Sequence, residues 1–148
     1  MSDLDIKNIA DIEVLRSYYH SINIENTYDA ILALKKINSV DSSRELIQLY
    51  NECLWRSIKI EILKALGSHS NQRSIEFMIQ VAKSDEDLPL ALISIESLGN
   101  TQSPLALRFL ENIYSQGHKS KKSTVTLALV KLLSVSMQDI FISDLKFV

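Results

Sequence analysis

The sequence predicts an all-α fold, a short right-handed solenoid of paired helices. A pattern of apolar residues repeats through the middle of the chain with a period of about 32 residues, and a fixed period of this length is typical of stacked repeat units. The chain also has only three glycines and two prolines, fewer than a fold with many tight β-turns needs. Four series of apolar residues keep the period: Leu34/Leu66/Leu98, Ile31/Leu63/Ile95, Leu46/Met78/Leu110 and Leu49/Val81/Ile113.

Each unit divides into two helices, and apolar residues at helical spacing mark both of them. The first unit is the weakest match, with helices expected over residues 12–22 and 27–37. The second unit starts near Ser42. Ser42 and Glu45 fit a capping box, in which the serine oxygen accepts a backbone N–H and the glutamate reaches back to the cap. We expect this helix to end at a short break over residues 51–54.

Glycines mark the ends of the next two second helices. The apolar residues of 58–66 precede Gly67, and those of 88–98 precede Gly99. A helix C-terminus tolerates a positive φ at such a glycine, so we expect Gly67 and Gly99 to end their helices in this way. Between them, residues 71–83 form the first helix of the third unit.

The fourth unit opens at Ser103 and Pro104, a cap followed by proline at the first helical position. Its first helix ends in a polar loop over residues 115–123. The helical pattern restarts over 125–133, slightly later than the repeat period predicts, so the loop has absorbed a small insertion. We expect a last helix over about 137–147, which is either a half-unit of the repeat or a capping helix that shields the open end of the stack.

Length and composition limit what the chain can be. We expect one domain, residues 1–148, with a repeat core over about 28–133. The net charge of −2 argues against a nucleic-acid binder. We find no signal peptide and no apolar stretch of membrane-spanning length, so we expect a cytoplasmic protein without membrane contact. The single Cys53 cannot form an intramolecular disulfide.

No pattern of catalytic or metal-binding residues stands out. His20, His69 and His118 lie near expected helix ends, without metal-ligand spacing, and we expect them to be solvated. The acidic run 85–87 caps a helix or holds a hard cation. The basic loop 118–122 is either solvated or meets an acidic partner. We therefore predict no enzyme activity, no cofactor and no metal.

Two segments resemble the second helix of HEAT-like repeats. The first, from Ile58, reads I-K-x-x-I-L-x-A-L-G; the second, from Leu90, reads L-A-x-x-S-I-x-S-L-G after Asp87. The pattern of that family is V-R-x-x-A-A-x-A-L-G, often with such an Asp three residues before it, and Ala91 replaces its arginine. The short repeat is similar to that of bilin-lyase-type proteins of phycobilisome biogenesis. The resemblance implies about four HEAT-like helix pairs plus a C-terminal helix.

In solenoids of this kind the second helices line the concave side, and their positions outside the core are available to a partner. Trp55 stands where the family has Asp, so it is either a binding anchor or partly buried. Ile93 is exposed at an interface, or belongs to the core if the helix is turned slightly. The predicted partner-binding residues are Tyr28, Asp29, Trp55, Glu61, Lys64, Ile93, Glu96 and Lys131.

These residues predict a protein-binding module without chemistry of its own. Asp29, Glu61 and Glu96 give the concave side an acidic character. One hypothesis is therefore a cytoplasmic inhibitor, such as an immunity protein that neutralises a basic toxin domain. The alternatives are an adaptor of a larger assembly and, from the resemblance, a phycobilin-lyase-like subunit with a tetrapyrrole pocket.

Overall fold

The computed structural model describes residues 5–19 and 23–145, with side chains as far as residue 134. Its described residues form α-helices without a β-strand, which confirms the predicted all-α solenoid. A short 3₁₀ helix, η1 (Ile6–Asn8), comes first. The α-helices are α1 (Ile12–Tyr19), α2 (Ile24–Ile37), α3 (Val40–Glu52), α4 (Arg56–Gly67), α5 (Gln72–Lys83), α6 (Leu88–Gly99), α7 (Pro104–Gln116) and α8 (Lys122–Leu145).

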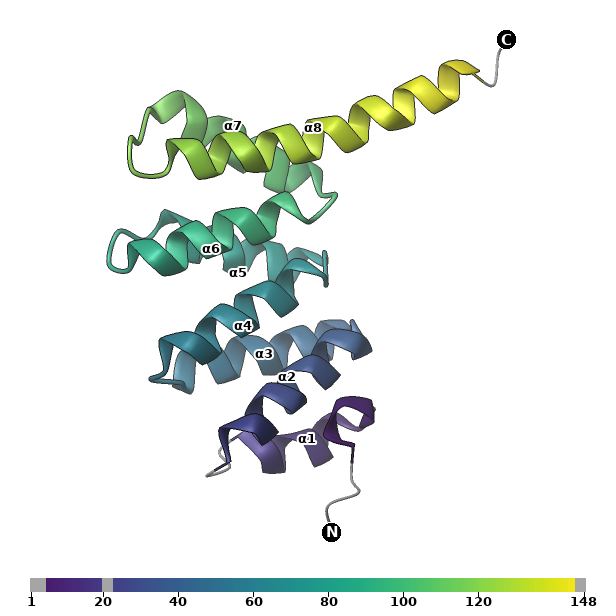
Figure 1. Ribbon diagram of the computed structural model, residues 1–148, viewed down its shortest axis with the longest axis vertical. Coiled ribbons are helices and arrows are strands. Elements are labelled where there is room, and N and C mark those ends of the chain that lie inside the picture. Colours follow the sequence, from purple (N-terminus) through teal and green to yellow (C-terminus); the bar gives the residue numbers. More distant parts are fainter. Residues whose placement is uncertain (1–4, 20–22, 146–148) are drawn as a thin grey trace.

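The helices stack as four antiparallel pairs in two layers (Figure 1). The second helices, α2, α4, α6 and α8, form one layer, and the first helices, α1, α3, α5 and α7, form the other. Leu34, Leu66 and Leu98 are fully buried, one on each of three successive second helices. Side chains one repeat period apart therefore occupy equivalent places between the layers.

The start of α3 differs from the prediction. Ser39, not Ser42, is the cap: Oγ of Ser39 accepts from N–H of Ser42 at 3.0 Å, and Oγ of Ser42 accepts from N–H of Ser39 at 2.8 Å. The box therefore lies one helical turn earlier, because Asn38 (φ 48°) already ends α2 in the left-handed conformation. Glu45 is free of the cap, and its buried carboxylate instead pairs with Arg16 of α1.

The C-terminal part also differs from the prediction. α8 runs without a break from Lys122 to Leu145, so the expected boundary before a separate helix at 137–147 is not found. The sequence has neither glycine nor proline in this stretch, so nothing interrupts the backbone hydrogen bonds. The last two residues of that expected helix lie outside the described residues, as do residues 20–22 of the expected first helix, His20 among them.

Gly67 and Gly99 are required for close contact between helices, not for a positive φ. The positive-φ residues in the described part of the chain are Asn38, Ser70 and Gly117. A Cβ on Gly67 would lie 3.0 Å from Cβ of Ser97 in α6, and one on Gly99 would lie 2.9 Å from Cα of Ala128 in α8. The repeated glycines let successive second helices approach one another.

His69 is buried, contrary to the expected solvated histidine. Its Nε2 lies 3.0 Å from the carbonyl oxygen of Leu34 and 3.1 Å from that of Lys35, at the end of α2. Its Nδ1 lies 2.6 Å from Oγ of Ser43 in α3. Carbonyl oxygens only accept, so Nε2 carries the hydrogen. The Ser43 hydroxyl, which already accepts from Asn71, can donate to Nδ1 of a neutral ring.

We expect His69 to make the protein less stable in mild acid. Burial lowers the pKa of His69 below its ordinary 6.5. As the pH falls below 6.5, the unfolded chain binds a proton that the folded chain does not, so the free energy of unfolding decreases. Denaturant unfolding at about pH 7.5 and about pH 5.5 measures the loss. His69→Gln should reduce this difference, and the control His118→Gln should keep it; an equal difference in both variants would contradict the assignment.

Candidate functional site

The candidate site is the outward side of α2, α4, α6 and α8, which we call the second-helix face. The structure places all of the predicted partner-binding residues on these helices or at their starts. Tyr28 and Asp29 lie on α2, and Trp55 is the N-cap of α4. The others follow in order along the stack: Glu61 and Lys64 on α4, Ile93 and Glu96 on α6, and Lys131 on α8.

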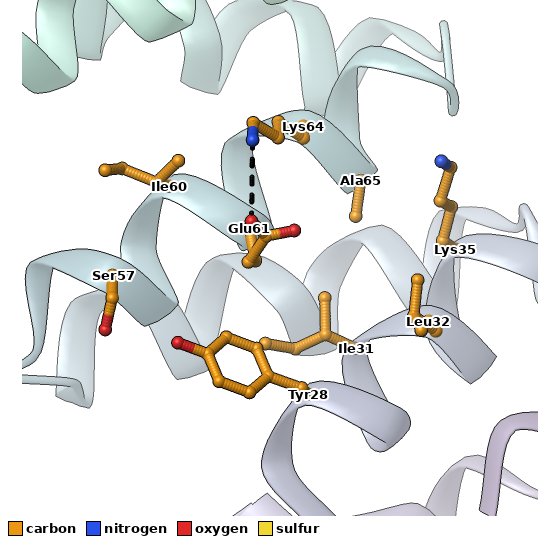
Figure 2. Close-up of a pocket in the computed structure, with 9 residues that line it drawn as sticks. All are labelled: Tyr28, Ile31, Leu32, Lys35, Ser57, Ile60, Glu61, Lys64 and Ala65. Carbon is orange, nitrogen blue, oxygen red and sulfur yellow. Dashed lines mark hydrogen bonds and ion pairs between the residues drawn. The ribbon is translucent and has the colours of Figure 1, made fainter. Parts of the chain in front are cut away.

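A hollow of about 440 Å³ opens on this face between α2 and α4 (Figure 2). It brings together Tyr28, Glu61 and Lys64 of the predicted set. Six further residues complete the lining: Ile31, Leu32 and Lys35 from α2, and Ser57, Ile60 and Ala65 from α4. The hollow is thus shared by two successive repeat units, and neither unit could form it alone.

The hollow combines an apolar floor with a charged rim. Ile31 and Ala65 are buried beneath it, while Leu32 remains exposed. Nζ of Lys64 lies 3.5 Å from Oε1 of Glu61, one turn away on the same helix (Figure 2). Exposed ion pairs of this kind contribute about 0–1 kcal/mol to stability. Lys64 and Glu61 can therefore separate and pair with charged groups of another protein at little cost. Such a surface suits an amphipathic protein segment.

The turn before α4 adds two exposed apolar side chains. Leu54 is 96% exposed and Trp55 is 68% exposed. One repeat later, Asp87 caps α6 through N–H of Leu90 and accepts from Nη2 of Arg56 at 2.9 Å. Trp55 has no side-chain oxygen with which to cap α4, and no cap hydrogen bond is made. Trp55 therefore remains in solvent, two residues before Ser57 of the hollow's lining.

The remaining predicted residues lie outside the hollow. Ile93 is half-buried and packs against the core, in line with the alternative that its helix turns it inward. Glu96 is exposed on α6. Nζ of Lys131 hydrogen-bonds to Oδ1 of Asn100, at the end of α6. These three residues extend the second-helix face toward the C-terminal end of the stack.

Leu32 and Ile60 line the hollow but are not among the residues predicted from the sequence. The repeat marks Leu32 as unusual, because the residues at the equivalent positions one and two units later are the charged Lys64 and Glu96. An apolar residue at a position that is charged in the other units indicates a local function or contact. Ile60 has no such signal, since its equivalents Tyr28 and Leu92 are also apolar or aromatic.

The acidic run and the basic loop each contribute some residues to the fold. Lys121 is buried, and its Nζ donates to the carbonyl oxygen of Ala82 at 3.0 Å and to Oδ1 of Asp85 at 3.1 Å. The Arg56 guanidinium hydrogen-bonded to Asp87 lowers the pKa of that carboxyl group. Among the residues that the structure describes, no group of three or more His, Cys, Asp or Glu side chains could hold a metal ion. No helix in that part of the chain combines the length and apolar character needed to cross a membrane.

Comparisons with known proteins support the architecture. No protein-family model matches the sequence, and no curated protein matches it either. A solved structure of human deoxyhypusine hydroxylase, in complex with glycerol, matches with a TM-score of 0.71 and 16% sequence identity. The match covers 85% of this chain and 44% of that one, so the chain spans less than half of the hydroxylase. The hydroxylase is a HEAT-repeat protein, and the two share this helical fold.

The same comparison corrects one prediction. We expected from the sequence that the chain is not an enzyme. The matched protein is an enzyme, a hydroxylase by name, so the fold does not exclude catalysis. The prediction treated the lack of a recognised catalytic motif as a lack of catalytic activity. That step fails because a helical scaffold of this kind supports unrelated activities.

Proposed function

We propose that the second-helix face docks a protein partner, centred on the hollow between α2 and α4. The observation that carries the proposal is this hollow, together with exposed Leu54 and Trp55 in the segment just before α4, the helix that supplies much of its lining. Isolated exposed apolar residues are ordinary, but an apolar-floored hollow and an exposed tryptophan contributed by one helix and its N-cap are typical of binding surfaces.

The scaffold favours such binding energetically. α2 and α4 are packed into the core through buried residues such as Ile31 and Ile62, so the backbone of the hollow is ordered before a partner arrives. A preformed surface avoids much of the entropic cost of ordering on binding. Tryptophan contributes a large apolar area with few rotatable bonds, which makes Trp55 the expected anchor.

We expect Trp55→Ala and Leu32→Glu each to weaken the partner roughly 30-fold, or about 2 kcal/mol. Trp55→Ala removes the anchor, and Leu32→Glu places a charge in the apolar part of the hollow. Affinity capture from native cells would identify the partner, and calorimetry with the purified pair would measure the dissociation constants. Both side chains are exposed, so the melting temperature should change little.

Tyr114→Ala is the matched control for these variants. Tyr114 is an exposed aromatic residue on α7, in the other layer of helices. It should leave the dissociation constant unchanged within about twofold. Unchanged binding in both hollow variants, or an equal loss in Tyr114→Ala, would refute the assigned face.

The chemistry of the partner separates the finer proposals. An inhibitor of a basic toxin domain, acting in the cytoplasm, would use Asp29, Glu61 and Glu96 to attract its target. Glu61→Lys with Glu96→Lys should then slow association, most strongly at low salt. An adaptor of a larger assembly with a neutral or acidic partner should show no such slowing.

The finer resemblance, to bilin-lyase-type proteins, gives a second proposal with a different ligand. A tetrapyrrole would need an apolar surface such as that of Ile31, Leu32 and Ile60, with cations for its carboxylates, which Lys35 and Lys64 could supply. Addition of a bilin to the purified protein tests this directly. A shift of its absorption spectrum that Leu32→Glu abolishes would support a lyase-type role, and an unchanged spectrum would exclude it.

A further inference from the structure

The hollow between α2 and α4 has a positive charge without a counter-ion. Its lining contains three charged residues, Lys35, Glu61 and Lys64. Nζ of Lys64 lies 3.5 Å from Oε1 of Glu61, so these two charges offset each other. Among the described residues, none forms an ion pair or a hydrogen bond with the exposed ammonium group of Lys35. The charge that remains at the hollow is therefore positive.

The polar groups of the lining are separated along the hollow. Lys35 and Lys64 lie in the last turns of α2 and α4, which run in the same direction in the stack (Figure 1). Tyr28 and Ser57 come from earlier parts of the same two helices, and Figure 2 shows them at the end away from Lys35. Ile31 belongs to the floor between them. The hollow thus has a hydroxyl end, an apolar floor and a cationic end.

The cationic end belongs to a basic side of the stack. The three loops that join a second helix to the following first helix lie on this side (Figure 1). These loops and the adjoining helix ends comprise residues 33–44, 64–76 and 96–108, which contain six Lys or Arg and three Asp or Glu. The whole chain instead has 18 acidic and 16 basic residues. Positive charge is therefore concentrated on the side where α2 and α4 end.

The helix dipole opposes this positive charge only in part. The C-terminus of α2 is equivalent to about half a negative charge. Lys35 and Lys36, in the last turn of α2, each carry a full positive charge. In addition, the carbonyl oxygens of Leu34 and Lys35 already accept from Nε2 of His69. An anionic group at this end of the hollow still meets a net positive charge.

A basic occupant would find little to pair with in the hollow. Glu61 is the only carboxylate among the described residues of the lining, and Lys64 already neutralises it. Asp29 does not line the hollow, and Glu96 lies one unit further along the stack, on α6. Charge complementarity therefore favours an acidic occupant.

We propose that the protein segment that docks in the hollow is amphipathic and acidic. Its apolar side chains rest on Ile31 and Leu32, and a carboxylate at one end of the segment pairs with the ammonium group of Lys35. Further acidic residues of the segment lie along the basic side of the stack. This inference rests on the proposed docking function and names the chemistry of the partner. Of the finer proposals, an adaptor with an acidic partner fits this arrangement, and an inhibitor of a basic domain does not.

Peptides selected from a phage-displayed random library on the purified wild-type protein test the proposal without the natural partner. Peptides of about 12 residues suffice, since they span about three helical turns. We expect the peptides that Leu32→Glu weakens to combine apolar residues with an excess of Asp and Glu over Lys and Arg. Fluorescence anisotropy with labelled synthetic copies measures their dissociation constants. Lys35→Glu should raise these constants at least about 10-fold, because a repulsion replaces an attraction.

Lys119→Glu is the matched control, because it makes the same charge change at an exposed lysine of the loop between α7 and α8. That loop lies on the opposite side of the stack (Figure 1), so the dissociation constants should stay within about twofold of the wild-type values. Circular dichroism should show unchanged helix content in the three variants, since positions 32, 35 and 119 are exposed.

The outcomes separate the acidic segment from the docking face itself. Selected peptides that Leu32→Glu weakens but that are basic would overturn the acidic segment and leave the docking face in place. Acidic peptides that bind Lys35→Glu as tightly as the wild type would do the same. If no peptide is selected, or if Leu32→Glu weakens none of them, both the docking face and the acidic segment are wrong.

Discussion

Leu66→Ala is expected to lower the free energy of unfolding by about 2–5 kcal/mol, the range for a leucine deleted from a close-packed core. Leu66 is fully buried on α4, which packs between α2 and α6. The cavity would lie where two interfaces between repeat units meet, and rigid helices on both sides limit collapse into it. Chemical denaturation followed by circular dichroism measures the change.

Leu54→Ala provides the comparison for this substitution. It removes the same atoms from a side chain that is almost fully exposed, so its effect should stay within about 0.5 kcal/mol. If both variants lost similar stability, Leu66 would not occupy the repeated core position. Leu34→Ala and Leu98→Ala, at the equivalent positions, should fall in the same range as Leu66→Ala.

Gly99→Val is expected to destabilise the protein by about 3 kcal/mol, at the upper end of the cost of overpacking. The new Cβ would lie 2.9 Å from both Cα and Cβ of Ala128, and Cα cannot move without its helix. The gain in helix propensity over glycine is only a few tenths of a kcal/mol, so the clash determines the sign. Thermal and denaturant unfolding measure the result.

A second substitution tests the cause. Ala128→Gly removes one of the two clashing atoms, so the double variant Gly99→Val/Ala128→Gly should be less destabilised than the sum of the single variants by at least about 0.5 kcal/mol. If the changes in the free energy of unfolding of the single variants were strictly additive, the two helices would not approach closely at this point. A Gly99→Val protein more stable than the wild type would show the same.

Periodic sequence features predicted the fold well because packing repeats with the chain. Leu34, Leu66 and Leu98 keep one spacing and share one environment. Local signals were less reliable. Ser42 could cap a helix with Glu45, but the chain offered Ser39 as a competing cap, and Glu45 is needed by Arg16.

Residues with distant partners could not be predicted in this way. His69 and Lys121 look like loop residues in the sequence, yet each makes hydrogen bonds to carbonyl oxygens of an earlier repeat unit. Only the folded chain brings these groups together. The same limit applies to the hollow, since Leu32 and Ile60 come from different units and meet only when α2 and α4 stack.

The repeat correctly predicted that Gly67 and Gly99 lie at helix ends, but the predicted reason for glycine there, a positive φ, was wrong. Their spacing of one repeat period marks the ends of successive second helices, as predicted. Neither has a positive φ, and the requirement for glycine comes from the neighbouring helix. A residue type that has two physical uses cannot be assigned to one of them from its spacing alone.

Site-specific photocrosslinking in native cells tests the assignment of the docking face most directly. A photoreactive amino acid placed at Leu32, at Trp55 or at Tyr114 reports which protein touches that position. We predict adducts to one and the same protein from positions 32 and 55, and no adducts to that protein from position 114. Adducts to that protein from position 114 alone, or different proteins at 32 and 55, would contradict it.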